Sequence, residues 1–160
     1  MITQALRAML NKQHFVEEFP PQHIEKLAAL AKPVRFERDH VIFHEGDECS
    51  EFYMIVSGLV ALEIEAPGHT LRVHTLSAGD ELGWSALLMG GGGKHFQARA
   101  LERVEALAFE GADLLAACKE DTQFGFEFLQ RLLGVVAGWL QATRLQVLDM
   151  YSPVAKRAGA

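Results

Sequence analysis

The spacing of apolar residues along the chain changes twice, and each change predicts a new kind of element. Over residues 2–19 and 21–32 apolar residues recur at helical intervals, which predicts two short helices. The second helix is expected to open at Pro20-Pro21, a favoured helix start. The interval becomes two within residues 34–110 and helical again over 111–151. The chain therefore predicts helices, then strands, then helices.

The middle segment predicts a set of short antiparallel strands. The stretch from Val34 to Arg38 alternates apolar and charged side chains, as a half-buried strand does. Turn-forming residues separate the runs that follow, among them Glu45-Gly46-Asp47 and Ala78-Gly79-Asp80. Closely spaced strands favour an antiparallel β-roll or jelly-roll barrel, so the predicted class is α+β, with N-terminal helices and a long C-terminal helix in one domain, 1–160. The further strands are expected at 40–44, 52–56, 58–65, 69–76, 94–101 and 104–109.

Two apolar stripes run along the predicted C-terminal helix. The first repeats at alternating intervals of four and three, which is typical of a seam between two copies of one helix. A homodimer through residues 124–151 is therefore predicted, and the second stripe is expected to pack on the barrel. One broad apolar face without a partner is the alternative. The first stripe is Leu129, Leu133, Val136, Leu140, Thr143, Val147 and Met150, and the second is Phe128, Leu132, Val135 and Trp139.

Charge and composition narrow the classes of function. The formal net charge is −6, with 21 acidic against 15 basic residues, whereas phosphate-backbone binding needs the opposite balance. No nucleic-acid partner is expected. No apolar run reaches membrane-spanning length, and residues 1–11 lack the apolar stretch of a signal peptide, so we expect no membrane partner and a cytoplasmic location. Cys49 and Cys118 lack the spacing of a four-thiolate cluster.

The spacing of the histidines does not predict a metal site. His40 and His44 are four apart on a predicted strand, which separates them by about 13 Å. His69 and His74 are an odd interval apart and would face opposite sides of a strand. Haem held by a single histidine stays open as an alternative. Neither a nucleophile with its base nor a pair of carboxylates emerges, so an enzyme is not expected.

Two stretches resemble the cyclic-nucleotide-binding domain of the catabolite-activator type. Val41 to Leu62 resembles the strand–turn–strand repeat that opens that barrel, with Gly46 and Gly58 at its tight turns. Gly79 to Phe109 resembles the family's phosphate-binding cassette. The flanking helices match as well, so the resemblance covers nearly the whole chain, in a stand-alone form without a helix-turn-helix domain. It implies a regulatory β-roll whose small-molecule effector is a cyclic nucleotide, with no other cofactor.

The resemblance also implies a set of ligand-binding residues. In the family, a Gly-Glu pair, a short helix and an Arg hold the ribose and the cyclic phosphate. Gly83 keeps its place, but Trp84 replaces the Glu that binds the ribose 2′-hydroxyl, and Lys94 replaces the Arg. His95 replaces a small hydroxyl residue, and Thr143 falls on the position that reaches the base. The candidate ligand-binding residues are Leu82, Gly83, Trp84, Ser85, Lys94, His95, Thr143 and Arg144.

These replacements predict weakened binding of a ribose 3′,5′-cyclic phosphate. Losing a hydrogen bond to a charged Glu costs about 10- to 100-fold in affinity. Lysine keeps the positive charge but loses the bidentate contact that Arg makes with the phosphate. The expected function is a non-enzymatic sensor that signals through its dimer or a protein partner. The alternatives are a scaffold whose pocket is filled by Trp84 and Phe96, or a sensor of another small anion or of a planar metabolite such as haem.

Overall fold

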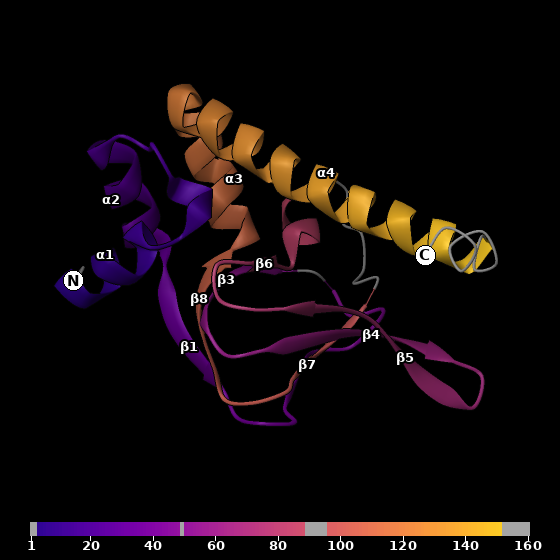
Figure 1. Cartoon of the computed structure of the whole chain (residues 1–160). Helices are drawn as coiled ribbons and strands as arrows, with labels where there is room; N and C mark the ends of the chain where they lie inside the picture. The colour runs from indigo at the N-terminus through magenta and orange to yellow at the C-terminus, as the bar shows by residue number, and fades with distance from the viewer. Residues whose placement is uncertain (1–2, 49, 89–95, 152–160) are drawn as a thin grey trace.

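Two antiparallel sheets form a roll that helices flank (Figure 1). The computed structural model describes residues 3–48, 50–88 and 96–151, and in this part of the chain each sheet has four strands, in the orders β1-β8-β3-β6 and β2-β7-β4-β5. The predicted α+β class, with a β-roll, N-terminal helices and a long C-terminal helix, is confirmed. The elements are α1 (Gln4–Asn11), η1 (His14–Val16), α2 (Pro21–Leu30), β1 (Lys32–Phe36), β2 (Val41–Phe43), β3 (Glu51–Ser57), β4 (Val60–Ala66), β5 (His69–Leu76), β6 (Glu81–Leu82), η2 (Trp84–Leu87), β7 (Gln97–Ala100), β8 (Val104–Glu110), α3 (Gly111–Glu120) and α4 (Thr122–Tyr151).

Strand β3 is buried on both faces because its sheet lies between the helices and the interior of the roll. Phe52 and Met54 belong to the apolar core beneath the helices, which we call the helical cluster. Ile55 belongs to the core inside the roll, the roll cluster. Successive side chains of a strand point to opposite faces, so a strand covered on both sides is apolar almost throughout. This explains why β3 lacks the alternation that marks β1.

The turn between β3 and β4 requires glycine at position 58. Gly58 has φ of +96°, a left-handed conformation that residues with a Cβ rarely adopt. A Cβ at this position would lie 2.4 Å from the carbonyl oxygen of Arg103. The expectation of a tight turn at Gly58 is therefore confirmed, with both a conformational and a steric reason.

The N-terminal helix is shorter than predicted. The expected helix over 2–19 ends at Asn11, and the chain continues through the separate turn η1. The side chain of Gln13 is buried and donates to the carbonyl oxygen of Ile55, at 3.2 Å. The change of direction brings the Phe15 ring to 5.0 Å, centroid to centroid, from that of Phe128. Packing into the helical cluster thus overrides local helix propensity.

The helical stretch after Phe109 is divided into two helices. Asp121 has φ of −124° and ψ of 96°, which breaks the helix between α3 and α4. Its carboxylate accepts a hydrogen bond from the backbone N–H of Phe124 and pairs with Lys26 at 3.0 Å. Asp121 therefore acts as an N-terminal cap for α4, which can then pass across the roll (Figure 1).

Several strands differ from the expected runs, and β4 begins at Val60 rather than at 58. Strand β6 was not predicted, since two residues carry no measurable alternation. Strand β7 begins at Gln97 rather than at 94; residues 94 and 95 lie outside the described part of the chain. Strand β1 begins two residues earlier than expected, at Lys32, and ends at Phe36.

The second apolar stripe of α4, which was expected to pack on the barrel, packs partly on the roll cluster and partly on the helical cluster that covers the sheet. Phe128 and Leu132 are buried in the helical cluster, Val135 packs against that cluster, and Trp139 packs against the roll cluster. The first stripe faces mainly away from the roll. Within it, Leu140 is 71% exposed in the single chain.

Candidate functional site

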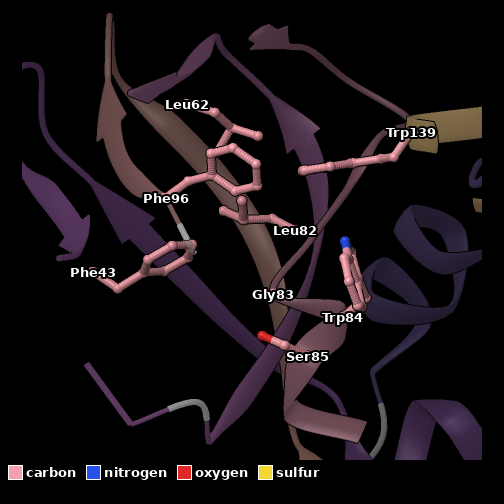
Figure 2. Close-up of a pocket in the computed structure, with 8 residues that line it drawn as sticks. All are labelled: Phe43, Leu62, Leu82, Gly83, Trp84, Ser85, Phe96 and Trp139. Carbon is pink, nitrogen blue, oxygen red and sulfur yellow. The ribbon is translucent and has the colours of Figure 1, made fainter. Parts of the chain in front are cut away.

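Four of the predicted ligand-binding residues line one small cavity at the mouth of the roll (Figure 2). Its volume is about 20 Å³, and we call it the cassette cavity. This space can hold about one water molecule. Aromatic rings fill most of the region, so the cavity as it stands is too small for a sugar phosphate. Its lining residues are Phe43, Leu62, Leu82, Gly83, Trp84, Ser85, Phe96 and Trp139.

The cassette takes its shape from a strand, a left-handed glycine and a short helix. Leu82 pairs with Tyr53 of β3, which fixes the chain to the roll. Gly83 has φ of +79° and turns the chain into η2, where the N–H of Ala86 donates to the Gly83 carbonyl. Ser85 therefore lies at a helix start, as expected, and its side chain is buried.

Trp139 of α4 lies at the centre of the rings that close the cassette cavity. Its indole stands edge-on to Trp84, with ring centroids 6.3 Å apart, and edge-on to His74 at 5.8 Å. Phe96 contacts it as well, at 6.0 Å. Figure 2 shows Trp139 extending from α4 across the cavity, with the ring of Trp84 standing below it. Sequence reasoning placed Trp139 only in the packing stripe; a tryptophan on the barrel-facing side of that helix was the signal that could have identified it.

A second, larger cavity adjoins the first between α4 and the hairpin formed by β4 and β5. It measures about 240 Å³, and we call it the hairpin cavity. Leu62, Phe96 and Trp139 form a wall common to both cavities. Gln146 holds the far end of α4 against the hairpin, because its side-chain nitrogen donates to the carbonyl oxygen of Val73 at 2.5 Å.

The remaining predicted residues are divided between the hairpin cavity and the surface. Thr143 lines the hairpin cavity, and its hydroxyl donates to the backbone carbonyl of Trp139 at 3.0 Å. Arg144 is exposed on α4 and lines neither cavity. Lys94 and His95 lie outside the described residues.

Arg99, which lies within the segment that resembles the cassette, is paired with carboxylates. The guanidinium of Arg99 on β7 lies 2.8 Å from Glu63 and 3.3 Å from Asp39. Hydrogen bonding from Arg99 holds the pKa of the Glu63 carboxyl below its usual value. Leu62 belongs to the roll cluster, so Glu63 and Arg99 lie on the outer face of the sheet. This ion pair ties β4 to β7 and leaves Arg99 ill suited to receive a phosphate.

Glu81 is a buried carboxyl on the opposite side of β6 from the roll interior. Its side chain is about 8% exposed and lines a cleft between η1 and α4, together with His14, Asp80 and Arg131. Burial, reinforced by the charge of Asp80, raises the pKa of Glu81 to about 7. Since Leu82 points into the roll while Glu81 points away from it, this carboxyl does not take part in the cassette cavity.

The described residues contain neither a metal-binding cluster nor a membrane-spanning helix. Nowhere in this part of the chain do three or more His, Cys, Asp or Glu side chains gather in an arrangement that could hold a metal ion. Within the same residues, the helices are all too short or too polar to span a bilayer.

Comparison with known proteins links this geometry to a family. A cyclic nucleotide-binding domain from Methylobacillus flagellatus has a TM-score of 0.79 at 18% identity, covering 91% of this chain and 82% of that one. The Catabolite Activator Protein of Thermus thermophilus has a TM-score of 0.71 at 24% identity, and the match covers 86% of this chain and 62% of that one. Both likenesses establish the fold.

A curated relative agrees at the level of sequence. The CRP-like cAMP-activated global transcriptional regulator of Mycobacterium tuberculosis is 26% identical over 130 residues, which cover 81% of this chain and 56% of the regulator. The chain therefore spans little more than half the length of the curated relatives it matches. The model of the cyclic nucleotide-binding domain matches residues 33–121, a range that contains all of the roll after the first residue of β1 together with η2 and α3. The chain belongs to the cyclic nucleotide-binding domain family.

Proposed function

We propose that the chain is a non-enzymatic sensor module that binds a small effector between the roll and α4. Binding of the effector changes the position of α4, and α4 transmits the signal. One observation carries the proposal: Trp139 of α4 forms a wall of both the cassette cavity and the hairpin cavity. A ligand in either space must contact Trp139 or displace it. Because α4 also bears the exposed apolar stripe, movement at Trp139 would alter the surface that a second subunit or a protein partner binds.

A cyclic nucleotide is the first effector to test, since the curated relative is described as cAMP-activated. A thermal-shift screen of the purified chain against cyclic nucleotides, linear nucleotides, haem and small aromatic compounds is the direct experiment. A ligand at 100 times its dissociation constant stabilises the folded state by about 2.7 kcal/mol. If no compound raises the melting temperature, the sensor function is refuted in favour of a scaffold.

The small size of the cassette cavity favours that scaffold as the second candidate. Trp84, Phe96 and Trp139 occupy the region where the family binds its ligand, as a vestigial pocket would require. The hairpin cavity distinguishes the two functions, since a scaffold has no need of an accessible space of about 240 Å³ beside the cassette.

Replacing Trp84 with Glu is expected to strengthen cyclic AMP binding by about 10- to 100-fold, because it restores a charged acceptor for the ribose 2′-hydroxyl. The substitution also removes a ring that stands edge-on to Trp139 and narrows the cavity. Lys94→Arg is expected to add to the gain through a two-pronged phosphate contact. Calorimetric titration of the wild type and both variants measures the effect.

Trp84→Gln is the matched control, since it opens the same space without adding a charge. It should gain less affinity than Trp84→Glu. Tight cyclic AMP binding by the wild type, weakened by Trp84→Glu, would instead identify Trp84 as a ring that stacks on the ligand.

We further propose a homodimer through the exposed stripe of α4. Leu133, Leu140 and Met150 are the most exposed large apolar members of this stripe, and a second copy of the helix would cover them. Leu140→Asp is expected to convert the dimer to monomer, because it places a charge within an apolar seam. Light scattering at tens of micromolar checks the mass. Gln141→Asp is the control, being exposed on α4 but off the stripe, and it should remain dimeric. A monomeric wild type would rule out the seam.

A further inference from the structure

The hairpin cavity is about twelve times larger than the cassette cavity, at about 240 Å³ against about 20 Å³. An apolar cavity of roughly 150 Å³ in a protein is known to hold a benzene molecule. The hairpin cavity therefore has room for one aromatic ring and for a second ring fused to it. The cassette cavity has room for neither.

The walls of the hairpin cavity are apolar and partly aromatic. Trp139 comes from α4, Phe96 precedes β7, and Ile64 and Val73 come from the hairpin. Ala142 completes the wall from α4, where its small side chain leaves the space open. Aromatic side chains favour planar ligands, which they contact by stacking or edge to face.

Three polar side chains contribute to the lining: His74 from β5, and Thr143 and Gln146 from α4. Each can exchange a hydrogen bond with a hydroxyl or carbonyl group on a ligand. Lys, Arg, Asp and Glu are absent from the described lining of this cavity. An ionised phosphate moved into this space would lose its hydration without gaining a paired charge from these described lining residues.

We propose that the effector of this module is an uncharged, planar aromatic molecule of one or two rings with a single polar edge, held in the hairpin cavity. The proposal rests on the proposed sensor function and names its ligand class. The rings lie between Phe96, Trp139 and the hairpin, and the polar edge meets Thr143 and its neighbours. The ligand thus touches Trp139 directly, while the cassette remains closed by Trp84.

Titration with 2-naphthol tests this assignment, with 2-naphthyl phosphate as its charged counterpart. The chain has two tryptophans, and both line the cavities, so their fluorescence reports binding. We expect 2-naphthol to bind saturably and 2-naphthyl phosphate to bind at least tenfold more weakly. Tighter binding of the phosphate ester, or of cyclic AMP, would overturn the proposed ligand class while leaving the sensor function intact.

Ala142→Leu fills the cavity from α4 and is expected to weaken 2-naphthol binding at least tenfold. The matched control is Ala137→Leu, an exposed position on the same helix that lines neither cavity, and its affinity should equal that of the wild type. Unchanged affinity in Ala142→Leu would refute the site. An altered mass of this variant in light scattering would also refute it, by assigning the cavity to a subunit interface.

Thr143→Val keeps the shape of an exposed side chain and removes only its hydroxyl, so it tests the polar edge without threatening the fold. We expect 2-naphthol to bind this variant about three- to tenfold more weakly, the loss of one hydrogen bond. Equal affinity for variant and wild type would exclude Thr143 from the site. If neither naphthalene compound nor any nucleotide binds, the sensor function fails together with the ligand class.

Discussion

Glu81→Gln is expected to remove most of the pH dependence of stability between pH 5 and pH 8. The pKa of Glu81 is about 7 in the folded chain, against an ordinary value of 4.5. Below pH 4.5 the carboxyl is protonated in the folded and the unfolded state alike. As the pH rises toward 7, the unfolded chain releases the proton first, so the free energy of unfolding falls and then levels off above pH 7. A shift of this size corresponds to about 3 kcal/mol. Urea unfolding at pH 5, 6, 7 and 8 measures the fall.

The groups that face Glu81 explain the direction of the shift. Burial is the largest cause, and the neighbouring carboxylate of Asp80 adds to it by repelling a second negative charge. His14 on η1 acts in the opposite sense, since its positive form would favour the ionised carboxyl. From α4, Arg131 lines the same cleft, but it donates to the backbone carbonyl of Glu17 and lies over the Phe19 ring.

A second carboxyl provides the control for this pH experiment. Glu65 is exposed at the end of β4, and Glu65→Gln should retain the pH dependence of the wild type. Glutamine has nearly the shape of protonated glutamate, so Glu81→Gln should be as stable at pH 8 as at pH 5. If the free energy of unfolding of Glu81→Gln changed with pH as steeply as that of the wild type, the pKa of Glu81 would lie near its ordinary value.

The sequence predicted the elements whose patterns are local. The run over 69–76 coincides with β5, since this strand is largely exposed and begins directly after a clear turn at Gly68. The prediction for 2–19 failed after Asn11, because the path there depends on contacts between Phe15 and residues more than 100 positions away in α4. Such long-range contacts do not produce a periodic pattern of apolar residues in the local sequence.

In the candidate site, too, the residues of one local segment were predicted and those brought in from distant elements were not. Resemblance to the family led to the segment from Leu82 to Ser85, and these residues do share one cavity. It did not lead to Phe43 or Trp139, which reach that cavity from β2 and α4. The hairpin cavity was also not predicted. The size of a cavity depends on the distance between distant elements, and the sequence of neither element determines it alone.

Phe128→Ala is expected to cause the largest loss of stability among these variants, about 3–5 kcal/mol. The Phe128 side chain is 0% exposed. Its ring lies 5.0 Å from that of Phe15, 5.8 Å from Phe124 and 6.1 Å from Phe52, centroid to centroid. Truncation leaves a cavity where η1, β3 and α4 meet, and none of the three can close it without breaking other contacts. Urea unfolding at constant pH measures the loss, and the melting temperature should fall by roughly 6–20 °C.

Phe126 is a matched control on the same helix, since its side chain is 70% exposed. Phe126→Ala removes the same atoms from water rather than from the core, so its stability should change by no more than about 0.5 kcal/mol. Phe128 also lies in the stripe that docks α4, three turns before Trp139. Loss of the docking contact should therefore loosen the wall shared by the two cavities and weaken 2-naphthol binding, whereas Phe126→Ala should leave it unchanged. Equal losses of stability in the two variants would show that α4 is not anchored through Phe128.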